Sequence, residues 1–254
     1  MVGIYALCCG YLEFERKLFF PDSERGTVMT IPVPSYLIVH PKGKVLLDTG
    51  MHPDALTDPV RRLGERIAKS YRLRCQSNEN VIDQLALLGL GADDISHVVN
   101  SHFHFDHCGC NAFFPRAQFL VQQDEIQAAR DALKKVDGRD WNHPLDYRPV
   151  QGEHDVFGDG ALVLLPTPGH SAGHQSLCVH ASAQQQIVFA CDACYSREHL
   201  ERKILPATAV WNAAAMRDSL AKLQELSERT DVTLVYGHDL DQWKAIPHAP
   251  EAMA

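Results

Sequence analysis

The chain has 254 residues, of which 45% are hydrophobic and 22% charged, and its formal net charge is -8. This composition is typical of a folded globular protein, and the length allows one large domain or two small ones. The negative net charge, with a pI near 5.9, argues against a nucleic-acid partner, which would require a clustered basic face.

The start of the chain and its apolar stretches predict a protein without a membrane partner. Residues 1–9 lack the basic and long apolar segments of a signal peptide. No stretch reaches the roughly 18 apolar residues that span a bilayer. We therefore expect a soluble, cytoplasmic protein. The eight cysteines agree with this, because a chain of this length needs no disulfide framework, and we expect small buried thiols.

The first half of the chain predicts strands, with a helical insertion between them. Apolar runs predict strands at 4–12, 35–40, 45–47 and 98–99. Residues 51–80 show no strand pattern and predict helices and loops, followed by a helix at 81–90. We interpret the basic residues of the insertion as a solvated helix face; they are Arg61, Arg62, Arg66, Lys69, Arg72 and Arg74. The apolar residues Phe19 and Phe20 predict either core or the wall of a substrate pocket.

The second half continues the same pattern of strands and helices. The expected strands are 118–122, 161–166, a hairpin formed by 175–180 and 186–190, and 232–238. Helices are expected at 124–136, with Asp124 as the N-cap, and at 213–229. The segment 137–152 is rich in Asp, Pro and aromatic residues, and it predicts a long loop.

The segment Ser101-His102-Phe103-His104-Phe105-Asp106-His107 combines three imidazoles with a carboxylate directly after a predicted strand. A single histidine is more often a surface or core residue than a ligand. In an extended segment, however, His102, His104 and Asp106 would share one face. Because three convergent ligand groups are costly to hold together without a cation, the segment predicts a metal site that suits zinc, iron, cobalt or manganese.

Other predicted strands also end at residues of the ligand type. His170, Asp192 and His238 each follow such a strand. Together with the histidine-rich segment they supply the nitrogen and oxygen donors that two adjacent metals need, and Asp192 is suited to bridge them. Asp48 follows the strand at 45–47, and we expect its carboxylate to orient a ligand histidine.

These motifs resemble those of the metallo-β-lactamase superfamily over nearly the whole chain. The resemblance rests on S-H-F-H-F-D-H, T-P-G-H, the aspartate at a strand end and the final G-H. It implies an α/β protein with four layers, the αβ/βα sandwich, formed by residues 1–254 as a single hydrolase domain. It further implies two divalent metal ions, with zinc as the first choice. One metal is assigned His102, His104 and His170, the other Asp106, His107 and His238, with Asp192 between them.

Within the superfamily the sequence is most similar to the N-acyl homoserine lactonases. The shared features are I-P-V-P, L-D-T-G, H-F-D-H-C-G, T-P-G-H-S-A-G-H-Q-S, and Tyr195 three residues after Asp192. The similarity implies a quorum-quenching enzyme that opens a small-molecule lactone by attack of a metal-bridging hydroxide. Tyr195 would donate a hydrogen bond to the carbonyl oxygen, and Asp106 would carry a proton to the leaving alkoxide.

Alternatives to this function stay open at the level of the sequence. They are another lactonase, such as one acting on 4-pyridoxolactone, a promiscuous esterase or phosphotriesterase, and a metal-binding domain without catalysis. A serine hydrolase is disfavoured because the sequence has no G-x-S-x-G motif. The sequence leaves open the acyl-chain length, the formation of a homodimer, and the role of the cysteines near the predicted site, which are Cys108, Cys110, Cys191 and Cys194.

Overall fold

The computed structural model describes residues 2–133, 138–182 and 184–254. The strands are β1 (Gly3–Glu15), β2 (Val28–His40), β3 (Gly43–Leu47), β4 (Arg72–Arg74), β5 (His97–Val99), β6 (Gln118–Gln122), β7 (Asp146–Val150), β8 (His154–Asp155), β9 (Leu162–Pro166), β10 (Gln175–Ser182), β11 (Gln185–Cys191) and β12 (Val232–Tyr236). The α-helices are α1 (Asp54–Thr57), α2 (Pro59–Leu63), α3 (Glu65–Ser70), α4 (Val81–Ala86), α5 (Phe105–Cys108), α6 (Gln123–Ala132), α7 (Arg197–Arg202), α8 (Ala213–Ser227) and α9 (Leu240–Ala245). Short 3-10 helices span Arg16–Leu18, Ala92–Asp94 and Asn111–Phe113.

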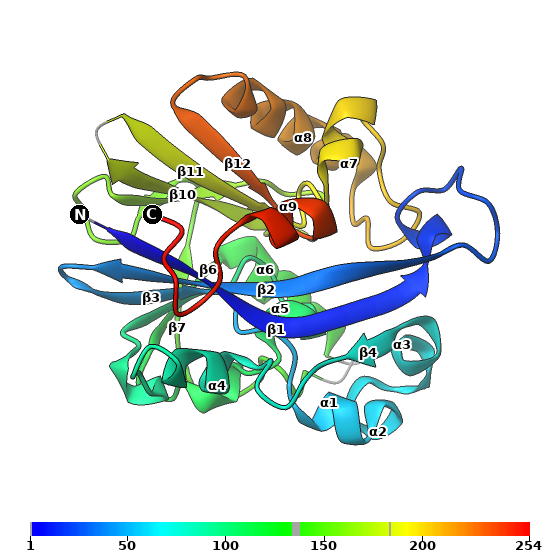
Figure 1. Cartoon of the computed structure of the whole chain (residues 1–254), viewed down its shortest axis with the longest axis horizontal. Helices are drawn as coiled ribbons and strands as arrows, with labels where there is room; N and C mark the ends of the chain where they lie inside the picture. The colour runs from blue at the N-terminus through cyan, green and yellow to red at the C-terminus, as the bar shows by residue number, and fades with distance from the viewer. Residues whose placement is uncertain (1, 134–137, 183) are drawn as a thin grey trace.

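Two mixed sheets lie face to face (Figure 1). The larger has the strand order β4-β1-β2-β3-β5-β6-β7, and the smaller has the order β12-β11-β10-β9-β8. In the larger sheet β3, β5, β6 and β7 run parallel, whereas β4, β1, β2 and β3 pair antiparallel. In the smaller sheet only β11 and β12 pair in parallel. The carboxyl ends of β3, β5 and β6 therefore meet at one edge, as do those of β9, β11 and β12.

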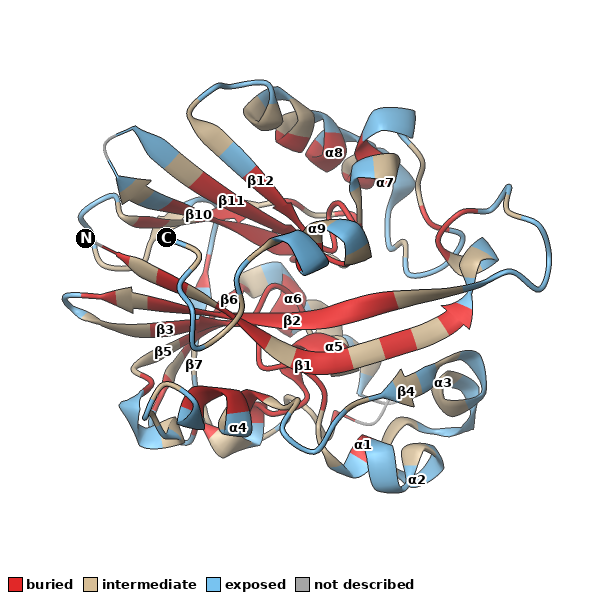
Figure 2. Ribbon diagram, viewed as in Figure 1, coloured by how far each residue is buried: buried red, intermediate tan, exposed pale blue. Residues whose placement is uncertain are grey.

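Three apolar cores separate four layers. Successive side chains of a strand point to opposite faces, so Leu46 of β3 packs towards the helices of the larger sheet while Val45 and Leu47 face the smaller sheet. In the same way Phe189 of β11 lies between the sheets, and Val188 packs under α7 and α8. Figure 2 shows buried residues along the strands and exposed residues on the outer surfaces of the helices. The layers confirm the predicted αβ/βα sandwich.

Most predicted elements are confirmed at their expected places. The strand expected at 35–40 is the second half of β2, and the hairpin is formed by β10 and β11. The helix expected at 213–229 is α8, whose Leu220 and Leu223 are buried. The helix expected at 81–90 is shorter, because α4 ends at Ala86. None of the helices in the described ranges is long and apolar enough to cross a membrane.

Other expectations about the elements are wrong. The segment expected as a loop at 137–152 contains β7, and the insertion expected to lack strands contains β4. Both strands lie at sheet edges, where polar side chains and Pro149 are tolerated and the alternating pattern is weak. Asp124 is not an N-cap, because the chain passes from β6 into α6 with Gln122 at the cap position. Residues 134–136 of that expected helix lie outside the described residues, and α7 and α9 were not expected.

Candidate metal centre and substrate cavity

The histidine-rich segment adopts a different backbone from the one that its sequence predicts. β5 ends at Val99, and α5 begins at Phe105 with His104 at its N-cap. The expected common face of His102, His104 and Asp106 is therefore wrong, because Asp106 lies in a helical turn. His102 and His104 belong to one group of donor atoms, and Asp106 belongs to another.

The first donor group consists of His102, His104, His170 and Asp192, and all its donor atoms lie within 4.8 Å of one another. Nε2 of His170 lies 3.0 Å from Nε2 of His102 and 2.9 Å from Nδ1 of His104. Oδ2 of Asp192 lies 3.2 Å from the same nitrogen of His170. Three imidazoles and one carboxylate oxygen thus surround a single point.

The second donor group consists of Asp106, His107 and His238. Oδ1 of Asp192 lies 3.2 Å from Nε2 of His107 and 3.0 Å from Nε2 of His238. Oδ2 of Asp106 lies 3.7 Å from Nε2 of His107. Asp192 therefore presents one oxygen to each group, as a bridging ligand would.

The donor atoms fit a pair of cations. Nε2 of His107 and Oδ1 of Asp192 are buried without a hydrogen-bond partner among the described residues. Nδ1–H of His107 donates to Asp48 over 2.8 Å, and Nδ1–H of His238 donates to the carbonyl of Pro32 over 2.8 Å, so the Nε2 lone pairs face the centre. Lone pairs that converge away from water require positive charge between them.

The pKa shifts of the imidazoles also agree with a pair of cations at this centre. Burial lowers the pKa of His102 well below its usual value, and the neighbouring imidazoles lower it further. The ring is therefore neutral and available as a ligand. Burial also opposes a charged His107, but the carboxylates of Asp192, Asp106 and Asp48 outweigh it and raise the pKa of His107. The carboxylates at this centre thus favour a positive charge among them.

Asp48 fixes the orientation of the second donor group, as the sequence predicts. Its carboxylate accepts hydrogen bonds from the backbone N–H and the hydroxyl of Ser101, each over 2.7 Å, and from His107. Asp48 holds a φ of 59°, which is uncommon for a residue with a Cβ. This backbone turn directs a buried carboxylate to the start of the histidine-rich segment.

Glu125 is a further positioning residue, which sequence reasoning missed. Its buried carboxylate accepts hydrogen bonds from the backbone N–H of Phe103 over 3.1 Å, the hydroxyl of Ser171 over 2.7 Å and the backbone N–H of Gly173 over 2.9 Å. A Cβ at Gly173 would lie 2.2 Å from the backbone nitrogen of Glu125. Glu125 therefore ties together the segments that carry His104 and His170. Its place shortly after a predicted strand, which it shares with Asp48, is a signal that could have identified it.

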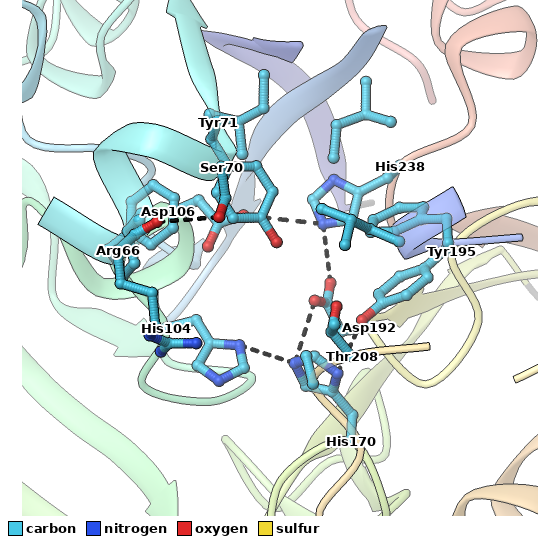
Figure 3. Close-up of a pocket in the computed structure, with 17 residues that line it drawn as sticks. Arg66, Ser70, Tyr71, His104, Asp106, His170, Asp192, Tyr195, Thr208 and His238 are labelled. Atoms are coloured by element: carbon cyan, nitrogen blue, oxygen red, sulfur yellow. Dashed lines mark hydrogen bonds and ion pairs between the residues drawn. The ribbon is translucent and has the colours of Figure 1, made fainter. Parts of the chain in front are cut away.

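A cavity of about 270 Å³ opens over both donor groups (Figure 3). Residues of the donor groups that line it are His104, Asp106, His170, Asp192 and His238. Tyr195 lines it as well, with its hydroxyl 3.0 Å from Nδ1 of His170. Phe19 stacks on Tyr195 with ring centroids 4.1 Å apart, whereas Phe20 packs on His199. Both aromatic residues belong to the core, and Phe19 also lines the cavity.

Tyr195 is a neutral hydrogen-bond donor at this cavity. Burial raises its pKa well above the usual value, and the nearby carboxylate of Asp192 adds to the shift. With Nε2 of His170 facing the donor group, its Nδ1 carries the proton and donates to the phenol oxygen. The phenol O–H is then free to donate to a molecule in the cavity.

The cysteines near the centre are free buried thiols, as predicted. Within the part of the chain that the structure describes, none of them belongs to either donor group. The Sγ atoms of Cys191 and Cys194 contact the backbone carbonyls of Phe189 and Ser196. Burial raises the pKa of Cys108, so this thiol stays protonated and is a poor metal ligand.

A four-layer sandwich with His and Asp donors at its strand ends defines a class of metal-dependent hydrolases. The model of the metallo-β-lactamase superfamily matches residues 29–238. An N-acyl homoserine lactonase of Rhizobium radiobacter, AttM, is 34% identical over 262 aligned positions that cover 100% of this chain and 99% of that protein. An N-acyl homoserine lactonase of Bacillus thuringiensis is 28% identical over 89% of this chain and 88% of that protein.

Solved structures give the same result. An N-acyl homoserine lactone hydrolase with N-hexanoyl-L-homoserine bound at its catalytic metal centre has a TM-score of 0.87 to this chain at 26% identity, covering 98% of both chains. A variant of AiiA from B. thuringiensis with N-decanoyl-L-homoserine at its active site has the same score and identity. The chain therefore belongs to the metallo-β-lactamase superfamily and, within it, to the N-acyl homoserine lactonases.

Proposed function

We propose that this protein is a quorum-quenching lactonase that opens the ring of N-acyl homoserine lactones. The observation that carries the proposal is the cavity in which the Tyr195 hydroxyl and both donor groups face one another. The similarity to AttM and to the product-bound hydrolase supports the choice of substrate.

In this proposal His102, His104 and His170 would hold one divalent cation, Asp106, His107 and His238 would hold the other, and Asp192 would offer one carboxylate oxygen to each. Zinc is the preferred metal, because imidazole and carboxylate donors suit it, with iron, cobalt and manganese as alternatives. When bound, the cations supply an activated water and polarise the lactone carbonyl.

The protein's own residues position the lactone and move the proton. Tyr195 donates its hydroxyl proton in a hydrogen bond to the carbonyl oxygen, where negative charge grows during attack. Ring opening leaves an alkoxide, which needs a proton. Asp106 is buried and lines the cavity, and in this proposal its carboxylate carries that proton from the nucleophile to the leaving oxygen. The ring of Phe19 stacks on the ring of Tyr195 and holds it in place.

The test is the rate of acid release from N-acyl homoserine lactones with short and long acyl chains, followed in a pH-stat. Protein of measured metal content is compared with a chelator-stripped sample and with samples reloaded with zinc, iron, cobalt or manganese. We expect metal-dependent ring opening that returns on reloading. A fully metallated sample that opens none of these lactones would contradict the proposal and redirect the search to other lactones, esters and phosphotriesters.

We further propose that residues 1–254 act as one domain in a reducing compartment such as the cytoplasm. Both sheets contribute to one shared core, and the backbone N–H of Ile4 donates to the carbonyl of Ala254 over 3.0 Å. The eight cysteines are all free, which supports a reducing compartment.

A further inference from the structure

Arg66 is exposed to solvent and also lines the wall of the cavity. It belongs to α3, in the insertion between β3 and β4. Arg66 is one of the residues that line the cavity, and Figure 3 shows its side chain running from α3 towards His104. The exposure of Arg66 agrees with the solvated helix face that the sequence predicts, and its place in the cavity wall is an additional feature that the sequence does not show.

The guanidinium of Arg66 has no hydrogen-bond or ion-pair partner among residues 2–133, 138–182 and 184–254. Its basic neighbours differ in this respect. Arg62 pairs with Asp140, and Nζ of Lys69 lies 2.7 Å from Oε2 of Glu65. Arg66 thus presents its N–H donors to the cavity without a carboxylate to satisfy them.

The cavity wall combines polar and apolar residues. The polar residues include Arg66, Ser70, Tyr71 and Thr208. The apolar residues include Leu12, Leu18, Ile31 and Ile67. Burial raises the pKa of Tyr71 to about 12, while the charge of Arg66 and a hydrogen bond with Thr208 oppose the shift. The Arg66 charge therefore acts inside the cavity, close to the phenol of Tyr71.

The geometry points to Arg66 as a specificity residue for the acyl arm. We propose that it favours N-acyl homoserine lactones that carry a keto or hydroxyl oxygen on the β-carbon of the acyl chain. This proposal rests on the proposed function. With the lactone carbonyl beside Tyr195 and the donor groups, a guanidinium near His104 faces the acyl atoms closest to the ring. The apolar residues then receive the rest of the chain.

The preference arises because only an oxygenated acyl chain can accept a hydrogen bond from the guanidinium of Arg66. A β-oxygen accepts a charge-assisted hydrogen bond from the guanidinium when the acyl arm displaces water. An unsubstituted chain displaces the same water but leaves the guanidinium donors unpaired. Because Arg66 is exposed at the cavity mouth, the expected preference is moderate, about 5- to 30-fold in kcat/KM.

The experiment compares kcat/KM for homoserine lactones that carry hexanoyl, 3-oxohexanoyl or 3-hydroxyhexanoyl groups. We expect wild-type protein to prefer the two oxygenated substrates. In Arg66→Gln the preference should fall close to one, mainly through a higher KM for these two, and Arg66→Lys should retain part of it. Arg61→Gln, which removes an equal charge from the same insertion but does not line the cavity, should keep the wild-type preference. The metal content of each variant is measured, because Arg66 lies near His104.

The possible outcomes distinguish the role of Arg66 from the lactonase function itself. Equal loss of activity on all three substrates in Arg66→Gln, or a wild-type protein without a preference, would overturn the role of Arg66 and leave the lactonase intact. Failure of metal-loaded wild-type protein to open any of the three lactones would instead overturn the proposed function.

Discussion

The donor groups and the part of the cavity wall formed by α3 are built in opposite ways. The donor side chains are almost all buried, and residues from distant parts of the chain, such as Asp48 and Glu125, hold them in place. Arg66 and Ser70, in contrast, are exposed on a six-residue helix. In our proposal the buried donor groups carry out the chemistry, and the exposed residues of α3 contribute to the choice of substrate. Changes to the first should abolish activity on every substrate, whereas changes to the second should re-rank substrates.

The largest effect is expected for Asp192→Ala. The substitution removes both oxygens that join the two donor groups, so the variant should lose bound metal and lactone hydrolysis together. Metal content is measured by elemental analysis alongside the hydrolysis rate. Asp192→Ala protein that keeps two metals and normal turnover would show that the donor groups are not the catalytic centre. His180→Ala serves as the control, since His180 is an exposed residue of β10.

A smaller loss of metal affinity is expected for Glu125→Ala. Without the carboxylate, the segments that carry His104 and His170 lose their common anchor, and metal affinity should fall about 10- to 100-fold. Competition with a chromophoric chelator measures the affinity directly. Glu125→Gln can still accept two of the three hydrogen bonds and should lie between Ala and wild type. Asp124→Asn, at the exposed neighbouring position, should leave the affinity unchanged. Equal affinities in all these variants would remove Glu125 from the positioning residues.

The contrast between the two regions also explains what could be predicted from the sequence. The ligand residues were predictable because His and Asp at successive strand ends carry their chemistry in the residue type. Glu125 was missed because its function depends on Phe103, Ser171 and Gly173, and only the folded chain places them around it. The four-residue helix α5 was also missed, because so short a segment shows no helical period.

The cavity wall was the least predictable part for a physical reason. A polar helix face such as that of α3 has the same sequence pattern whether it meets solvent or a cavity. The pairing of β4 with β1 joins the insertion to the larger sheet, and only the folded chain shows that the exposed Arg66 also lines the cavity. The edge strand β7 was missed on similar grounds, since an edge strand with exposed polar residues does not show the pattern of a core strand.

Tyr195→Phe should slow turnover and leave the metals bound. The ring keeps its stacking on Phe19, but the hydroxyl that donates to the carbonyl oxygen is lost, so we expect kcat to fall about 10- to 100-fold. Steady-state kinetics on one lactone, with metal analysis of the same sample, measures both effects. Tyr5→Phe, far along β1 from the cavity, controls for the loss of a phenol. An unchanged kcat would remove Tyr195 from the catalytic residues, and loss of metal would give it a structural role.

The smallest expected effect is that of His199 on the free energy of unfolding at low pH. His199 is buried, Nε2–H donates to the carbonyl of Phe19 over 3.2 Å, and Nδ1 accepts from the hydroxyl of Ser196 over 2.8 Å. Burial lowers the pKa of His199 from 6.5 to about 4. Between these values the unfolded chain binds a proton that the folded protein does not, so this residue reduces stability as the pH falls.

His199→Gln keeps a donor for the Phe19 carbonyl but removes the titration. Its free energy of unfolding should therefore fall less steeply between pH 6.5 and 4 than that of the wild type, by up to about 1.4 kcal/mol per pH unit. Urea unfolding of both proteins at several pH values, with equal metal loading, measures the difference in their free energies of unfolding. The release of metal in acid affects both proteins alike and largely cancels in this difference. Parallel pH profiles would show that His199 does not stay neutral in the folded protein. A profile that differs only in its slope would show that the imidazole of His199, which donates to the Phe19 carbonyl, stays uncharged in the folded protein.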